Sequence, residues 1–117
     1  MTIPVVAIVG LSNSGKTRVA TALVEILTER GYSIAAVKHS PHGHQVDRPA
    51  TDSARLFAAG AGRVIVSSPG QMTTIQQTIS DTPLEEIVAS LEPSYDLLIA
   101  EGFKRSTVPK VMVLKSE

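Results

Sequence analysis

Residues 10–17 read GLSNSGKT, and the spacing G-x-x-x-x-G-K-[ST] is typical of the loop that cradles phosphates in nucleotide-binding α/β proteins. Gly10 and Gly15 permit backbone angles that a Cβ forbids, and they let successive N–H groups approach phosphate oxygens. Lys16 offers a positive charge to the β- and γ-phosphates, and Thr17 offers a hydroxyl to Mg²⁺. The motif therefore predicts a site for a nucleoside triphosphate and a magnesium ion.

The residues around this motif predict the strand and the helix that such a loop requires. Residues 3–9 are mostly β-formers and predict a strand that leads into the loop. A helix is expected after the loop and ends before Gly31, because apolar residues recur there at helical spacing. These apolar residues are Val19, Leu23, Ile26 and Leu27. A second strand is expected over residues 33–38, and its carboxyl end shares a sheet edge with the loop, because a helical crossover joins parallel strands.

The rest of the chain predicts further elements of an α/β fold. For one helix, Thr82 is expected as the cap, with Pro83 at the first position and Glu85 completing the start. The expected elements are a helix over 51–60 capped by Thr51 or Asp52, a hairpin of strands 63–67 and 71–75, a helix from 82 that stops at Pro93, a buried strand over 97–100, and a last strand over 110–114. Together they predict one P-loop nucleotide-binding domain over residues 1–117, with three layers and a mainly parallel sheet that carries one β-hairpin.

Two acidic residues flank the buried strand 97–100, and a phosphate loop needs a carboxylate for its Mg²⁺. Ligands of open α/β sheets bind at the carboxyl ends of the strands. Glu101 lies at that end if the strand is parallel to the first one, whereas Asp96 lies roughly 17 Å away. Glu101 is therefore the candidate magnesium residue, and the alternative is that it only solvates the strand end.

A long polar segment begins at Lys38, at the end of the second expected strand, and lies on or beyond the sheet edge that carries the phosphate loop. Its candidate residues are Lys38, His39, His42, His44 and Asp47. The three histidines match no zinc spacing and have no cysteine to join them, so a substrate or γ-phosphate switch role is favoured over a structural metal. Farther on, Asp52 either binds Mg²⁺ through water or caps a helix. Arg55 either pairs with phosphate or covers its helix.

The overall composition excludes several classes of function. Lys+Arg 11 balance Asp+Glu 11, which argues against a nucleic-acid partner bound through phosphate charge. There is no cysteine for disulfides or thiolate metal sites. The start of the chain lacks a basic leader and residues 3–9 are too short to span a membrane, so a cytoplasmic protein is expected. The apolar last strand and the hairpin predict an exposed sheet edge that a homodimer would cover.

Taken together, the motifs resemble those of the molybdopterin-guanine dinucleotide biosynthesis protein B family, MobB. The resemblance covers nearly the whole chain in order. The segments that carry it are Val9–Thr17, Val37-Lys38-His39 with His42 and His44, Asp47-Arg48-Pro49, Asp52-Ser53, Ala59-Gly60-Ala61, Glu101-Gly102-Phe103-Lys104 and Pro109-Lys110. One segment departs from the family pattern Pro-Gly-Lys-Asp-Ser, because residues 49–53 read PATDS and lack the glycine and the lysine.

The resemblance implies a dimeric P-loop protein that binds GTP and hydrolyses it weakly. It implies that this protein assists the guanylyltransferase that joins GMP to molybdopterin, and molybdopterin is a further candidate partner. Because no Asn-Lys-x-Asp motif follows Glu101, the preference for GTP over ATP is implied by the resemblance alone. The residues expected to bind the nucleotide are Gly10, Leu11, Ser12, Asn13, Ser14, Gly15, Lys16, Thr17, Arg18, Lys38, His39, Asp47 and Asp52. The expected catalytic residues are Lys16 and Glu101, and the expected magnesium residues are Thr17 and Glu101.

Two other functions fit the same motif. The first is a P-loop small-molecule kinase that uses ATP or GTP, in which the histidine-rich segment holds an acceptor hydroxyl and Asp47 is the base. The second is a nucleotide-sensing scaffold that does not hydrolyse its ligand.

Overall fold

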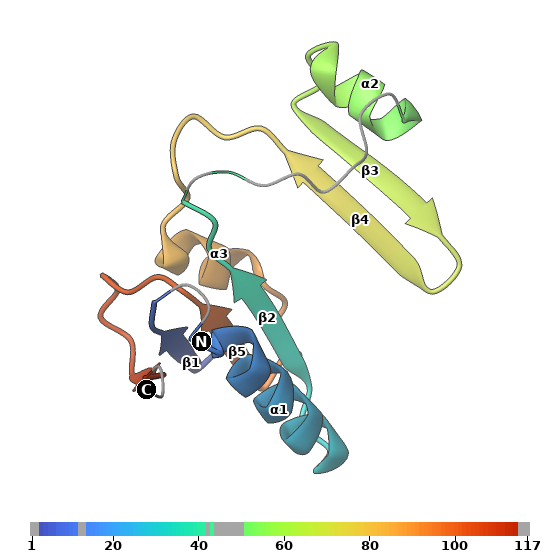
Figure 1. Ribbon diagram of the computed structural model, residues 1–117. Coiled ribbons are helices and arrows are strands. Elements are labelled where there is room, and N and C mark those ends of the chain that lie inside the picture. The colour runs from blue at the N-terminus through green and yellow to red at the C-terminus, as the bar shows by residue number, and fades with distance from the viewer. Residues whose placement is uncertain (1–2, 12–13, 42, 44–50, 115–117) are drawn as a thin grey trace. The chain divides into compact units, whose positions relative to one another are not determined.

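The computed structural model describes residues 3–11, 14–41, 43 and 51–114, and its chain divides into two compact units. The first unit comprises residues 1–40 and 82–117, and the second comprises residues 41–81. The elements, in chain order, are β1 (Val5–Val9), α1 (Lys16–Glu29), β2 (Ile34–Lys38), α2 (Asp52–Ala58), β3 (Arg63–Ser68), β4 (Gln71–Gln76), α3 (Leu84–Ser90), β5 (Leu97–Glu101) and β6 (Lys110–Met112) (Figure 1). Within the described residues, every helix is too short or too polar to cross a membrane.

The first unit is built on a four-stranded sheet in the order β2-β5-β1-β6, and all neighbouring strands are parallel. In this register Glu101 lies beside Ile8 on one side and beside Lys38 on the other. The carboxyl ends of β1, β2 and β5 therefore meet at one edge of the sheet (Figure 1). This confirms the predicted parallel sheet, and it places the end of β5 next to the start of the phosphate loop.

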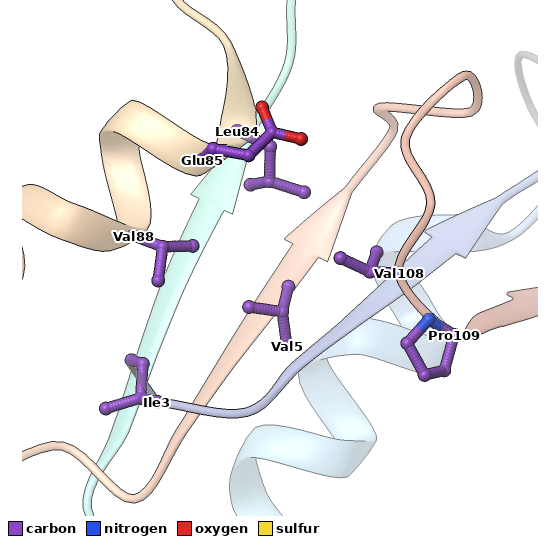
Figure 2. Close-up of a pocket in the computed structure, with 7 residues that line it drawn as sticks. All are labelled: Ile3, Val5, Leu84, Glu85, Val88, Val108 and Pro109. Carbon is purple, nitrogen blue, oxygen red and sulfur yellow. The ribbon is translucent and has the colours of Figure 1, made fainter. Parts of the chain in front are cut away.

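One face of this sheet carries α3 and a groove of about 290 Å³ (Figure 2). The groove is lined by Ile3, Val5, Leu84, Glu85, Val88, Val108 and Pro109. Its walls come from the start of β1, from α3 and from the segment before β6. The lining is therefore apolar except at Glu85, and it lies toward the end of β1 that is remote from the phosphate loop.

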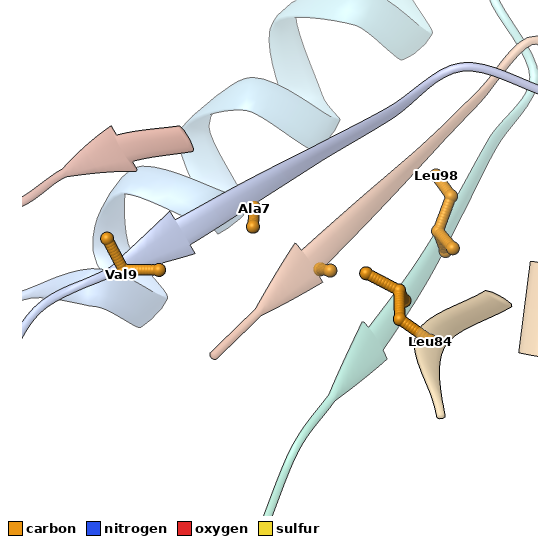
Figure 3. Packing of buried hydrophobic residues seen from close by; sticks show 5 residues of the cluster. Ala7, Val9, Leu84 and Leu98 are labelled. Carbon is orange, nitrogen blue, oxygen red and sulfur yellow. The ribbon is translucent and has the colours of Figure 1, made fainter. Parts of the chain in front are cut away.

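The hydrophobic core lies beneath the same helix. Leu84 of α3 packs against the side chains of β1 and β5 that point to this face: Ala7, Val9, Leu98 and Ala100 (Figure 3). Because side chains alternate along a strand, the buried Ile8 and Ile99 point to the opposite face, and α1 contacts β1, β2 and β5 there. The sheet thus lies between α1 and α3, as the predicted three-layer arrangement requires.

Helix α1 begins at Lys16, directly after the left-handed Gly15, and Gly31 follows its end with φ 93°. The predicted helix and its glycine terminator are confirmed. Ile26, however, is 46% exposed rather than part of the buried stripe. Successive residues of a helix are rotated by about 100°, so Ile26 lies at the edge of the half-buried stripe of α1. The centre of this stripe is formed by Leu23 and Leu27.

Several predicted element boundaries differ from those in the structure by one or two residues, and two of the differences have a local cause. Pro83, and not Thr82, is the N-cap of α3, and it makes no side-chain cap hydrogen bond. With an extended ψ of 149° at Pro83, helical geometry starts one residue later, at Leu84, and Glu85 is too early in the helix to complete a capping box. The last strand ends at Met112 rather than at residue 114, because Met112 is paired with Val9, where β1 itself ends.

The second unit contains α2 and the antiparallel hairpin of β3 and β4. Gly70, with φ 80°, provides the turn, and Val64 of β3 is buried. The side chain of Thr51 accepts a hydrogen bond from the Ala54 N–H at 3.3 Å, so Thr51 rather than Asp52 is the N-cap of α2. The predicted hairpin and the predicted helix are both confirmed.

Candidate functional site

The phosphate loop lies between β1 and α1, as the sequence predicts, and Gly10 occupies its tightest position. A Cβ on Gly10 would lie 2.7 Å from the Val113 carbonyl oxygen and 2.8 Å from Ser14 Oγ. The Val113 N–H donates to the Val9 carbonyl at 2.8 Å, which fixes this neighbour. Gly10 is thus required by the packing of the protein itself. The sequence gives no local signal for the contact with Val113, because the two segments are far apart in the chain.

Beside Gly10 the loop contains a buried hydroxyl that has no partner among the described residues. Ser14 Oγ is buried and makes no hydrogen bond to any residue that the structure describes. The Ser14 N–H donates to the Leu11 carbonyl at 3.1 Å, which closes the turn, and Gly15 follows with φ 97°. A buried hydroxyl is costly unless it is paired, and a phosphate oxygen is a suitable acceptor for its proton. The loop therefore fits a phosphate group on a criterion that is independent of the motif.

The predicted magnesium residues lie together at the carboxyl edge of the sheet. Thr17 Oγ1 donates a hydrogen bond to Glu101 Oε1 at 2.7 Å, and this bond joins the first turn of α1 to the end of β5. Two adjacent oxygen ligands of an octahedral Mg²⁺ stand about 3 Å apart, so this spacing suits the ion. Asp96 lies at the other end of β5, where its carboxylate accepts from the Ser33 N–H at 2.7 Å. The structure thus places Glu101, and not Asp96, beside the phosphate loop.

The turn after Glu101 packs against the end of β2. The rings of His39 and Phe103 are stacked, with centroids 4.6 Å apart and planes inclined by 25°. The His39 N–H donates to the Glu101 carbonyl at 2.9 Å, and the Gly102 N–H donates to the Ile8 carbonyl at 2.9 Å. The sequence alone predicts no role for Phe103. The signal that could have indicated one is its place two residues after Glu101, in the Glu-Gly-Phe-Lys segment.

The other predicted loop residues are placed as follows. Lys16 is half-buried at the start of α1, whereas Leu11 is 77% exposed. Arg18 is exposed in the first turn of α1, and Lys38 is exposed at the end of β2. Ser12 and Asn13 lie outside the described residues.

The remaining predicted residues belong to the second unit or lie outside the described residues. Asp52 is exposed in the first turn of α2 and does not cap that helix, and Arg55 is exposed in its last turn. Asp47, His42 and His44 are not among the described residues, so their predicted roles stay predictions. Among residues 3–11, 14–41, 43 and 51–114, no three His, Cys, Asp or Glu side chains gather at one point where they could hold a metal.

Comparison with known proteins places this site in a family. A family model described as Molybdopterin guanine dinucleotide synthesis protein B, MobB, matches residues 5–117. The molybdopterin-guanine dinucleotide biosynthesis adapter protein of Haemophilus influenzae is 32% identical over 116 residues, which cover 98% of this chain and 65% of that protein. The adapter protein of Escherichia coli is 33% identical over 116 residues, which cover 97% of this chain and 66% of that protein. The chain therefore spans just under two thirds of the length of these two relatives.

Solved structures agree with the sequence relatives. The crystal structure of Bacillus subtilis MobB superimposes with a TM-score of 0.75 at 33% identity, and the match covers 98% of this chain and 70% of that one. A MobB protein homolog from Bacillus stearothermophilus gives a TM-score of 0.74 at 25% identity, covering 96% of this chain and 64% of that one. The order of the motifs, the fold and the match over residues 5–117 lead to one conclusion: the chain belongs to the MobB family.

Proposed function

We propose that this chain binds GTP with Mg²⁺ at the phosphate loop and acts as an adapter in molybdenum-cofactor biosynthesis. The observation that carries the nucleotide part is the 2.7 Å hydrogen bond between Thr17 Oγ1 and Glu101 Oε1 at the carboxyl edge of the sheet. It joins the hydroxyl of the motif to a carboxylate at the place where α/β sheets bind their ligands. The unpartnered Ser14 hydroxyl supports the same assignment.

Each residue of the loop has a separate task in this proposal. The backbone N–H groups after Gly10 and at the start of α1 hold the phosphates, and the Lys16 ammonium neutralises charge on the β/γ oxygens. Thr17 and Glu101 hold the metal, directly or through a bound water. A magnesium ion at this point would draw charge from the β/γ oxygens and order the triphosphate. Because no residue is assigned as a general base, hydrolysis is expected to be slow.

The adapter part of the proposal comes from the relatives, whose names describe molybdopterin-guanine dinucleotide biosynthesis adapter proteins. The partner would be the guanylyltransferase that joins GMP to molybdopterin, in the cytoplasm, with molybdopterin as a further ligand. A homodimer is proposed as well. It is supported by exposed apolar residues on and after the edge strand β6, where Met112 is 67% and Leu114 79% exposed. Light scattering tests it, and a monomeric mass would rule the dimer out.

The small-molecule kinase remains the rival function, and no observation favours it. Its proposed base, Asp47, lies outside the described residues. Fast phosphate transfer that depends on an added small alcohol would identify a kinase, whereas slow GTP loss without any acceptor is expected of the adapter.

Calorimetric titration tests the nucleotide site directly. GTP and ATP are titrated with and without Mg²⁺ into the parent chain, into Lys16→Ala and into Glu101→Gln. Lys16→Ala is expected to abolish binding of both nucleotides, because it removes the charge that neutralises the phosphates. Glu101→Gln is expected to remove most of the gain in affinity that Mg²⁺ provides, while binding without Mg²⁺ is retained.

Asp96→Asn is the matched control for Glu101→Gln, since Asp96 directly precedes the first residue of the same strand, at the edge remote from the loop. It is expected to keep the full response to Mg²⁺. A parent chain that binds neither nucleotide would refute the proposal, and an equal effect of the two carboxylate variants would refute the assignment of Glu101.

A further inference from the structure

The turn after Glu101 has an unusual backbone. Gly102 has φ 97° and Phe103 has φ 59°, and Phe103 is the only non-glycine residue with positive φ in the described part of the chain. A bulky aromatic residue is strained in this conformation and keeps it only when its surroundings impose it. Such residues cluster at functional sites, so the contacts that hold Phe103 are informative.

His39, the residue directly after β2, provides these contacts. Its ring stacks on Phe103 with centroids 4.6 Å apart. Its Cβ lies so close to Gly102 that a Cβ built there would be 3.1 Å away. Its N–H donates to the Glu101 carbonyl at 2.9 Å. His39 thus contacts all three residues of the turn, which are Glu101, Gly102 and Phe103.

The left-handed turn begins directly after Glu101, whose carboxylate lies beside Thr17. The Glu101 side chain receives the Thr17 hydroxyl at 2.7 Å, and its backbone is held between Ile8 of β1 and Lys38 of β2. The turn follows Glu101 directly. The ring stack and the bond from the His39 N–H to the Glu101 carbonyl therefore both hold the end of β5 from which the carboxylate reaches Thr17.

We propose that His39 is a positioning residue, which holds the Phe103 turn by ring stacking and so fixes the Glu101 carboxylate beside Thr17. The inference rests on the proposed binding of Mg²⁺ by this pair and assigns His39 a task different from contact with the γ-phosphate. The stacking contact itself requires a flat ring at this position.

Three substitutions separate these roles. His39→Ala removes the stack, Phe103→Leu removes it from the other side, and His39→Phe restores a flat ring without nitrogen atoms. The measurement is the Mg²⁺ concentration that gives half of the gain in GTP affinity, with circular dichroism as the check of folding. His39→Ala and Phe103→Leu are expected to raise this concentration roughly two- to tenfold, the range for losing an aromatic pair. His39→Phe is expected to recover most of the loss.

Tyr32→Ala is the control, since Tyr32 is 52% exposed just before the opposite end of β2. It is expected to match the parent chain. GTP affinity without Mg²⁺ is expected to stay unchanged in all four variants. A loss of this metal-free affinity would overturn the proposal, because it indicates contact with the nucleotide. A His39→Phe variant as impaired as His39→Ala would overturn it as well, because ring stacking would then not carry the role.

Crystal structures of the His39 variants without nucleotide test the positioning independently of GTP. His39→Phe is expected to keep positive φ at Phe103 and the hydrogen bond between Thr17 and Glu101, and His39→Ala is expected to lose both. If His39→Ala keeps both, the positioning role is refuted even when the chain binds GTP. If the parent chain binds no GTP, the proposed function fails and these structures still decide the role of His39.

Discussion

The substitution Gly10→Ala tests whether the phosphate loop depends on its contact with the segment after β6. The added Cβ would lie 2.7 Å from the Val113 carbonyl oxygen, whereas ordinary contacts begin at 3.4 Å. One of the two backbones must therefore move by about 0.7 Å, the difference between these distances. The Val113 N–H is bonded to Val9 at 2.8 Å, so the strain falls on the pairing of β6 with β1 or on the loop itself.

The expected loss of stability is about 1–3 kcal/mol, the range for an overpacked site. Urea denaturation followed by circular dichroism measures it. GTP affinity in the presence of Mg²⁺ is expected to fall about tenfold or more, because small displacements of groups that bind phosphate have large effects. Calorimetry measures this second effect.

Gly62→Ala is the control, because a Cβ at Gly62 meets no atom within 4 Å and its backbone is not left-handed. It is expected to change stability by less than about 0.5 kcal/mol. A Gly10→Ala variant that is as stable as this control, and that binds GTP as the parent does, would refute the packing argument.

Three further substitutions test other parts of the fold. Leu98→Ala shortens a core side chain that is 1% exposed and is expected to lower the free energy of unfolding, measured by urea titration, by about 2–5 kcal/mol. Leu114→Ala, at a side chain that is 79% exposed, is the control and is expected to be nearly neutral. Asp96→Ala removes the acceptor of the Ser33 N–H at 2.7 Å and is expected to cost about 1 kcal/mol, read as a lower guanidinium midpoint with no change in GTP affinity. Thr51→Ala removes the N-cap of α2 and is expected to lower the free energy of unfolding by about 1 kcal/mol and to speed amide hydrogen exchange in that helix. Thr51→Ser keeps the hydroxyl and is expected to keep the slow exchange. Equal exchange rates in both variants would contradict the capping role.

The sequence predicts the elements around the loop and the place of Glu101 well because these signals are local or directional. The motif of residues 10–17 fixes a strand before it and a helix after it, and both are present. The position of Glu101 follows from direction alone. Once the strands are parallel, an acid at the carboxyl end of β5 must lie at the edge that carries the loop, and an acid at the other end lies far from it.

The features that the sequence does not reveal depend on distant contacts or on strain. Nothing near Val113 indicates that its carbonyl lies against Gly10, because this contact arises from the pairing of β6 with β1. Nothing near Phe103 predicts a left-handed backbone, since an aromatic residue normally avoids it and adopts it here in a stack with His39, the residue after β2. The N-cap of α3 lies one residue later than predicted. Pro83 has an extended ψ, so the helix begins only at Leu84.

The contact between Gly10 and Val113 also has a consequence for biosynthesis. The loop is translated well before the carbonyl against which it closes, because Gly10 and Val113 lie far apart in the chain. On the ribosome, the emerging chain can form α1 before it has anything to close the loop. The proposed nucleotide site is thus expected to close only once Val113 has been made, and a nascent chain that stops before Val113 is expected to bind GTP weakly.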